Sequence, residues 1–152
     1  MSGLVYAGIW AAFNIIGRLF FRYRAHGVEH IPKDGGVLFA ANHASYADIP
    51  FLGCGIPRRV SFLGRANLFS PPVLNWMFRK IAWIPLKTNR LDRQALKETV
   101  SRLKEGKSVV IFPEGTRTPH GDLQSGKPGI GVILAEVQCP VVPAYIAGTY
   151  EV

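Results

Sequence analysis

Residues 91–112, LDRQALKETVSRLKEGKSVVIF, place an amphipathic helical pattern directly before a short apolar run. From Leu91 to Glu105, apolar and small side chains recur on one helix face, and basic side chains fall largely on the opposite face. Gly106 stands where a helix cap is expected, and Ser108–Phe112 is predicted to be a strand buried on both faces. A helix that returns at once to a buried strand is typical of an α/β sheet.

The same alternation continues on both sides of this stretch. Four further apolar runs are predicted to be strands: Val37–Ala41, Val60–Leu63, Ala82–Leu86 and Val141–Ile146. We therefore predict an α/β fold, with a central, mostly parallel sheet of about five or more strands flanked by helices and preceded by a hydrophobic amino-terminal helix. Ligands of such sheets gather beyond the carboxyl ends of the strands, which directs attention to the residues after Ala41 and Ile111.

Composition bounds the class of protein. The chain has 152 residues, of which 48% are apolar and 18% charged, so it can fill the core of one domain and is not a disordered tail. Its two cysteines, Cys54 and Cys139, show neither metal-ligand spacing nor a disulfide framework. Zinc modules and disulfide-stapled secreted scaffolds are therefore disfavoured, and a reducing compartment is expected.

The charge is basic and unevenly placed. The net charge is +8, and residues 58–107 hold twelve Lys and Arg against three acidic residues, which accounts for the whole excess. Such a stretch favours a polyanion, an anionic membrane surface or a phosphorylated substrate. Nucleic acid is not expected, because neither a stacking-aromatic signature nor a helix-turn-helix pattern accompanies the charge. Within this stretch, residues 70–83 combine aromatic side chains with an Arg-Lys pair and suit either anionic lipid or a packed core helix.

The amino-terminal segment predicts a contact with a membrane. Residues 3–17 carry no charge, and as a helix they would reach roughly 22 Å, short of a ~30 Å hydrocarbon core. Basic residues Arg18, Arg22 and Arg24 follow this segment, whereas a signal peptide has basic residues before its apolar run. We predict that residues 1–26 form a membrane-associated, monotopic helix on the cytoplasmic face. The alternative is a hydrophobic helix packed on the domain.

The first motif with chemical potential directly follows the strand at 37–41. It has the sequence NHASYAD, residues 42–48, with His43 and Asp48 five positions apart. If His43 lies in a loop and Asp48 in the first helical turn, the chain folds back and brings the carboxylate to the imidazole. The carboxylate then fixes the tautomer, so that the other ring nitrogen can take a proton from a hydroxyl. The alternative is a histidine satisfied within a turn or cap.

A second motif, FPEGTR at residues 112–117, follows the strand at 108–112. A glycine-bearing turn there exposes backbone N–H groups beside a hydroxyl and a guanidinium, which suits a phosphate. A surface turn with an incidental arginine is the alternative.

Together, NHASYAD and FPEGTR, in this order and at this separation, resemble the glycerolipid acyltransferase family, the glycerol-3-phosphate and 1-acylglycerol-3-phosphate acyltransferases. Residues 83–90, WIPLKTNR, are similar to the second conserved block of that family, although Lys87-Thr88-Asn89 adds polar residues before Arg90. Residues 139–144, CPVVPA, are similar to its fourth block. The resemblance covers residues 27–149, so we expect an acyltransferase domain at 27–152. Relatives usually continue past this point, so we expect either a minimal or truncated form or a fragment of a longer domain.

The resemblance implies roles for particular residues. His43 would be the general base and Asp48 its orienting partner. The glycerol phosphate of the acceptor would be held by Arg90, Glu114, Gly115, Thr116 and Arg117. The family transfers a fatty acyl group from acyl-CoA or acyl carrier protein to a glycerol hydroxyl without an acyl-enzyme, so neither a metal nor another cofactor is expected.

The expected acceptor is 1-acylglycerol-3-phosphate (lysophosphatidate) in a membrane surface, and the product is phosphatidate. The motif constrains the acceptor weakly, and the rival within the same chemistry is acylation of glycerol 3-phosphate or another lysolipid. A rival of another class is a catalytically silent membrane-binding module, which the net charge and the apolar amino terminus favour.

Overall fold

Five strands form one sheet in the computed structural model, which describes residues 3–66, 83–87 and 92–151. The strands are β1 (Val37–Ala41), β2 (Val60–Arg65), β3 (Trp83–Leu86), β4 (Ser108–Ile111) and β5 (Val141–Ala144). Their order across the sheet is β3-β2-β4-β1-β5, and every neighbouring pair is parallel. The predicted parallel α/β sheet is therefore confirmed, with β4 and β1 next to each other near its centre.

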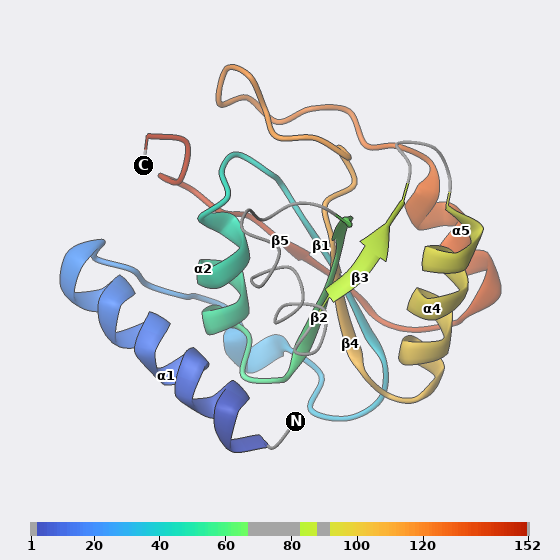
Figure 1. The fold of residues 1–152 in the computed structure, drawn as a ribbon, viewed down its shortest axis with the longest axis horizontal. Coiled ribbons are helices and arrows are strands. Elements are labelled where there is room, and N and C mark those ends of the chain that lie inside the picture. The colour runs from blue at the N-terminus through green and yellow to red at the C-terminus, as the bar shows by residue number, and fades with distance from the viewer. Residues whose placement is uncertain (1–2, 67–82, 88–91, 152) are drawn as a thin grey trace.

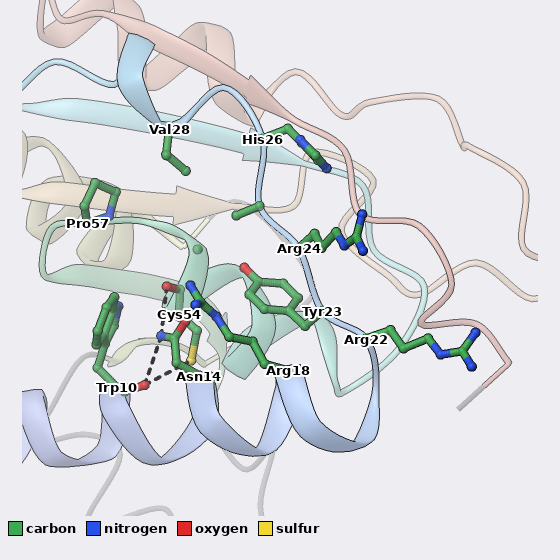
Figure 2. Close-up of a pocket in the computed structure, with 12 residues that line it drawn as sticks. Trp10, Asn14, Arg18, Arg22, Tyr23, Arg24, His26, Val28, Cys54 and Pro57 are labelled. Atoms are coloured by element: carbon green, nitrogen blue, oxygen red, sulfur yellow. Dashed lines mark hydrogen bonds between the residues drawn. The ribbon is translucent and has the colours of Figure 1, made fainter.

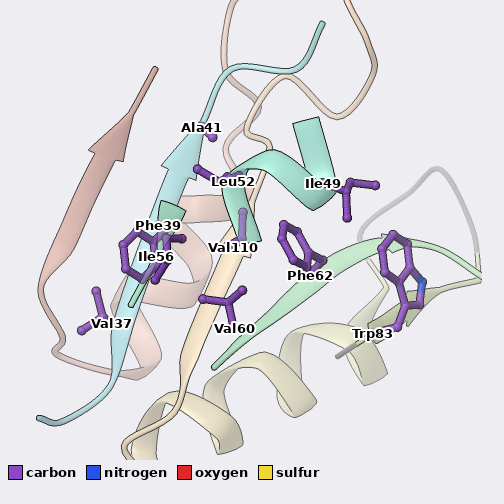
Figure 3. Close-up of a cluster of buried hydrophobic side chains, with 10 residues drawn as sticks. All are labelled: Val37, Phe39, Ala41, Ile49, Leu52, Ile56, Val60, Phe62, Trp83 and Val110. Carbon is purple, nitrogen blue, oxygen red and sulfur yellow. The ribbon is translucent and has the colours of Figure 1, made fainter. Parts of the chain in front are cut away.

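Helices cover both faces of the sheet (Figure 1). They are α1 (Gly3–Phe20), α2 (Asp48–Gly55), α4 (Arg93–Lys104) and α5 (Gly129–Glu136), with a short 3-10 turn, η1 (Val28–His30). On the α2 side, Phe39 and Val110 pack against Leu52 in one hydrophobic cluster (Figure 3). On the other side, Leu38 and its neighbours pack against Leu103 and the residues of α5. Successive side chains of one strand thus enter opposite cores.

Local sequence explains the elements at the centre of the sheet. Asp92 caps α4 by accepting hydrogen bonds from the backbone N–H groups of Gln94 and Ala95. Gly106, expected as the cap after this helix, has φ +78°, a conformation that favours glycine. Gly36 must lack a side chain, because a Cβ there would lie 2.1 Å from the carbonyl oxygen of Leu103. Gly106 and Gly36 thus allow the end of α4 to lie beside the start of β1.

Element boundaries differ slightly from the prediction. β5 ends at Ala144 rather than at Ile146, because both backbone groups of Ile146 bind the side chain of Asn42 at 2.9 and 2.7 Å. The strand predicted to reach Phe112 ends at Ile111. The segment at residues 70–83, predicted to face anionic lipid or to form a core helix, lies outside the described residues except for Trp83. Leu91, where a helix was predicted to begin, also lies outside them.

The amino-terminal helix α1 packs along α2 on one side and exposes its other side. Asn14, itself buried, donates from Nδ2 to the carbonyl oxygens of Trp10 and Cys54 at 3.1 and 3.2 Å. Gly17 lies so near Phe51 that a Cβ would come within 3.0 Å of its ring. The opposite side, which we term the exposed face of α1, carries the side chains of Phe13, Ile15, Ile16, Leu19 and Phe20.

Packing of α1 on the domain is therefore present on one side, while contact with a membrane stays a prediction for the other. Among the described residues, no helix combines the length and the apolar character needed to cross a bilayer.

Candidate active site

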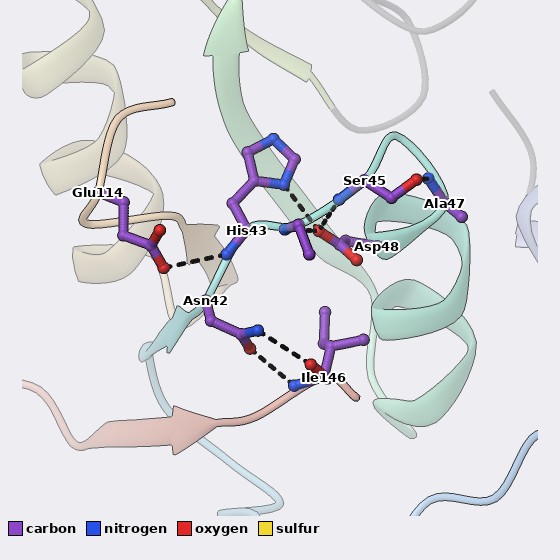
Figure 4. A network of polar contacts seen from close by, with 8 residues as sticks. Asn42, His43, Ser45, Ala47, Asp48, Glu114 and Ile146 are labelled. Carbon is purple, nitrogen blue, oxygen red and sulfur yellow. Dashed lines mark hydrogen bonds and ion pairs between the residues drawn. The ribbon is translucent and has the colours of Figure 1, made fainter. Parts of the chain in front are cut away.

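Two turns meet at the carboxyl ends of β1 and β4, which are neighbours in the sheet. The turn after β1 contains NHASYAD and leads into α2, and the turn after β4 contains FPEGTR. The His43 backbone joins them, since its N–H donates to Glu114 Oε1 at 3.1 Å and its carbonyl accepts from the Thr118 N–H at 2.8 Å. The sheet topology thus brings together the two motifs that the sequence singled out (Figure 4).

His43 and Asp48 lie in direct contact. Nδ1 of His43 is 2.8 Å from Oδ2 of Asp48, the first residue of α2, and the Asp48 side chain is fully buried. The same oxygen accepts from the backbone N–H groups of Ala44 at 2.6 Å and Ser45 at 2.9 Å. The chain therefore folds back as the spacing predicted, with the carboxylate at the amino-terminal end of α2, where the helix dipole stabilises negative charge.

The environment keeps this carboxyl group ionised. Burial raises the pKa of Asp48, but hydrogen bonds from His43, Thr149, Ser45 and Ala44 together outweigh burial and lower the pKa below its ordinary value of 3.8. An ionised carboxylate only accepts hydrogen bonds, so Nδ1 of neutral His43 carries the proton and Nε2 keeps a lone pair.

Nε2 of His43 is available to a substrate. The His43 ring stacks on Phe112 with centroids 4.0 Å apart and planes inclined by 15°. Its side chain keeps 14% of its surface exposed, and no described residue hydrogen-bonds Nε2. The aromatic stacking and the carboxylate hold the ring in place and leave Nε2 without a hydrogen-bond partner among the described residues.

The residues of FPEGTR divide into two groups. Glu114 is 4% exposed, and its carboxylate turns inward to the backbone of His43. Gly115 has φ +68°, and Thr116 and Arg117 are exposed. The Arg117 guanidinium lies 3.8 Å from the centre of the Tyr46 ring, a cation–π contact that holds it beside the NHASYAD turn. Arg117 and Thr116 thus lie at the rim of the site, whereas Glu114 is buried and holds the backbone of His43.

Arg90 lies outside the described residues. Another cation, which the sequence reasoning missed, lies at this rim. A Cβ on Gly115 would come within 2.7 Å of Nζ of Lys127, and the Lys127 backbone N–H donates to the Pro113 carbonyl at 2.7 Å. The only signal in the sequence is a cation in the turn Gly126-Lys127-Pro128-Gly129, which carries no information on its partner.

Comparison with known proteins agrees with this arrangement. Residues 22–147 match the family model described as Acyltransferase. The chain belongs to this acyltransferase family. It is 32% identical over 151 residues to the chloroplast 1-acyl-sn-glycerol-3-phosphate acyltransferase of Arabidopsis thaliana, covering 96% of this chain and 41% of the relative. Over 140 residues it is 30% identical to a 1-acyl-sn-glycerol-3-phosphate acyltransferase of Bacillus subtilis, covering 90% of this chain and 68% of that protein.

A solved structure shares the fold of this chain. The crystal structure of the 1-acyl-sn-glycerophosphate acyltransferase of Thermotoga maritima superposes with a TM-score of 0.80 at 34% identity, covering 96% of this chain and 59% of that one. The chain thus spans about two fifths of the length of the Arabidopsis relative and three fifths of the Thermotoga protein. The predicted resemblance to the glycerolipid acyltransferases is confirmed.

Metal-ligating side chains do not gather in the described part of this chain. Among residues 3–66, 83–87 and 92–151, no three His, Cys, Asp or Glu side chains lie close enough to hold an ion. The expectation that the reaction needs no cofactor stays a prediction.

Proposed function

We propose that the chain transfers a fatty acyl group from acyl-CoA or acyl carrier protein to the free hydroxyl of 1-acylglycerol-3-phosphate, giving phosphatidate. The observation that carries the proposal is the His43–Asp48 pair, with a free Nε2 beside a turn that presents exposed cations. The names of the relatives from Arabidopsis thaliana, Bacillus subtilis and Thermotoga maritima support the choice of acceptor.

His43 is the general base of the proposed reaction. Nε2 takes the proton of the acceptor hydroxyl while the hydroxyl oxygen attacks the thioester carbonyl carbon. The new C–O ester bond forms, the C–S bond breaks, and the departing thiolate receives the proton from His43. Asp48 stabilises the positive charge that the imidazole carries between these two proton transfers. The thioester supplies the activated acyl group, so no covalent enzyme intermediate is required.

The acceptor phosphate is held at the rim of the site. Arg117 supplies a guanidinium that can bind two phosphate oxygens, and Lys127 adds a second cation across Gly115. Gly115 and Thr116 contribute the exposed backbone between these cations, and Arg90 completes the proposed set. Glu114 joins this set indirectly, because it fixes the backbone of His43 rather than contacting the substrate.

The membrane surface that carries the acceptor is the proposed partner of α1. A groove of about 770 Å³ lies between α1 and the segment that follows it (Figure 2). Its lining includes the cationic or ionisable side chains of Arg18, Arg22, Arg24 and His26, and no Asp or Glu from the described part of the chain. We place the exposed face of α1 among the lipid acyl chains and these cations among anionic headgroups on the cytoplasmic face.

The test is acyl transfer by the purified chain in detergent, with labelled acyl-CoA or acyl-acyl carrier protein as donor. Lysophosphatidate, glycerol 3-phosphate and lysophosphatidylcholine serve as parallel acceptors. We expect product with lysophosphatidate and a loss of about a hundredfold or more in His43→Ala. The matched control is His30→Ala, because His30 is an exposed histidine in η1, and it should retain the rate.

Other results would redirect the proposal. Equal rates with all three acceptors would remove lysophosphatidate as the specific acceptor. Retained turnover in His43→Ala would remove His43 from the chemistry. Salt-sensitive binding to anionic vesicles without turnover by the unaltered chain would favour the silent membrane-binding module.

A further inference from the structure

The two oxygens of the Asp48 carboxylate differ in the hydrogen bonds that they accept. Oδ2 accepts from His43, Ala44 and Ser45, whereas Oδ1 is buried and has no hydrogen-bond partner of good geometry among the described residues. A buried carboxylate oxygen without a donor is costly, so it calls for a nearby hydrogen-bond donor. A carboxylate held at one oxygen alone can also swing about that oxygen, and the imidazole would follow it.

The Thr149 hydroxyl also lacks a hydrogen-bond partner of good geometry in the described part of the chain. Thr149 is 5% exposed, and its Oγ1 is buried. The Thr149 hydroxyl nevertheless acts on the Asp48 carboxylate, because it is among the groups that lower the pKa of Asp48. Each of these two buried atoms therefore offers what the other lacks, and a hydroxyl can rotate to give its proton to a nearby acceptor.

The segment that carries Thr149 is anchored on both sides. The backbone of Ile146 makes two hydrogen bonds with the Asn42 side chain, next to His43 in the chain (Figure 4). Tyr150 donates from its hydroxyl to the Pro119 carbonyl at 2.8 Å, in the loop that follows FPEGTR. Between these anchors, Gly148 has φ +82°, which favours glycine and turns the chain just before Thr149.

We propose that Thr149 is a positioning residue of the active site, which donates a hydrogen bond from Oγ1 to Asp48 Oδ1 and so fixes the plane of the carboxylate that orients His43. This inference rests on the proposed function, since it assigns a task within the same site. Among the described residues, hydrogen bonds connect two titratable groups to this carboxylate: His43 directly, at Oδ2, and Glu114 through the His43 backbone. Thr149 would thus complete a chain of contacts from β5 to the base.

The test compares Thr149→Val, which keeps the shape and removes the hydroxyl, with Thr149→Ser, which keeps the hydroxyl. We expect Thr149→Val to lower kcat about fivefold, the scale of one hydrogen bond, with little change in KM for the acceptor. Without the Thr149 donor, Asp48 is more basic and holds the proton on His43 more tightly. The acid limb of the pH–rate profile should therefore move to higher pH by about half a unit.

Two controls separate positioning from general loss of structure. Thr149→Ser should restore both kcat and the acid limb. Thr99→Val removes a buried hydroxyl in α4, whose hydrogen bond goes to the Ala95 carbonyl of the same helix, so it should leave the acid limb in place. A loss in Thr149→Val that is equal at every pH, or equally large in Thr149→Ser, would overturn the proposal.

A second measurement needs no turnover and keeps this proposal separable from the proposed function. The depressed pKa of Asp48 stabilises the folded protein above pH 3.8, and this stabilisation is lost as pH falls through the folded value. Thr149→Val reduces the depression, so its free-energy deficit against the unaltered chain should be largest at neutral pH and shrink in acid. A loss of stability in Thr149→Val that is the same at every pH would overturn the proposal, even if the chain proved to be active. A loss that shrinks in acid would support the hydrogen bond from Thr149 to Asp48, even if the chain proved to be inactive.

Discussion

The polar cluster around His43, at the amino-terminal end of α2, differs from the exposed face of α1 in how its side chains are surrounded. In the cluster, a fully buried carboxylate receives three hydrogen bonds at one oxygen, and His43 is held by a carboxylate and an aromatic ring. On α1, large apolar side chains such as Leu19 and Phe20, 72% and 75% exposed, have little protein around them. The proposed chemistry depends on fixed geometry in the first region, and the proposed partition into lipid depends on area and charge in the second.

The two regions should therefore fail independently. A change in the cluster should abolish turnover while vesicle binding is kept, and a change on α1 should do the reverse. The variants below test this independence.

Asp48→Asn should cause the largest effect. The amide can donate to Nδ1 of His43, which places the ring proton on Nε2 and removes the lone pair that accepts the hydroxyl proton. We expect kcat to fall by about a hundredfold or more, as in His43→Ala, measured by acyl transfer to lysophosphatidate, with unchanged sedimentation on anionic vesicles. A loss of vesicle binding in step with turnover would show that the two regions are coupled.

Asp48→Asn also predicts a pH dependence of stability. Because the pKa of Asp48 is lowered in the folded state, its contribution is present above pH 3.8 and is lost as pH falls through the folded value. Denaturant unfolding of both proteins should show a stability difference at pH 7 that shrinks below pH 3.8. A difference that grows in acid would contradict the ionised, hydrogen-bonded carboxylate.

Arg117→Ala and Lys127→Ala should each act on acceptor binding. Both cations lie at the rim beside Gly115 and Tyr46, and removing a charge-assisted contact to a phosphate costs about 1.5–3 kcal/mol. KM for lysophosphatidate should rise by about tenfold or more, against a smaller change in KM for the acyl donor. Lys104→Ala, at an exposed position on α4, is the matched control. An unchanged KM in Lys127→Ala would remove this residue from the phosphate site.

Leu19→Asp should weaken membrane binding without touching the chemistry. Burial of a leucine side chain is worth about 1.5–3 kcal/mol, so the vesicle partition coefficient should fall by about tenfold or more. Leu123→Asp is a matched control, because Leu123 is also 72% exposed but lies in the loop after FPEGTR. The rate with a water-soluble, short-chain lysophosphatidate should be kept in both variants. Equal loss of partition in both would mean that overall hydrophobicity, and not the exposed face of α1, governs binding.

The sequence predicted what depends on residues close together in the chain. β1 and β4 are short apolar runs buried on both faces, and the contact of His43 with Asp48 spans five positions, so both could be inferred from local patterns. The end of β5 could not, because it is decided by the contact of Ile146 with Asn42, 104 positions away.

The same limit explains which site residues were missed. Lys127 and Thr149 stand in turns with ordinary composition, and only the folded chain brings them to Gly115 and Asp48. Glu114 was expected to bind the substrate because it belongs to the FPEGTR motif. That role stays a prediction. The motif did not give the direction of the side chain, whose carboxylate accepts from the His43 backbone N–H in the fold.

The smallest expected effect concerns the reactivity of Cys54, which lies where α1 packs against α2. Its thiol donates to the Trp10 carbonyl of α1 at 3.7 Å, and burial raises its pKa to about 11. Burial raises the pKa of both thiols but covers Cys54 more completely, so iodoacetamide should modify the half-buried Cys139 first. Because Asn14 ties α1 to the Cys54 carbonyl, we expect anionic vesicles to leave the Cys54 rate unchanged within about twofold, as measured by peptide mass spectrometry. A faster modification of Cys54 than this would mean that α1 separates from α2 when it binds lipid. The two regions would then be coupled through the movement of α1.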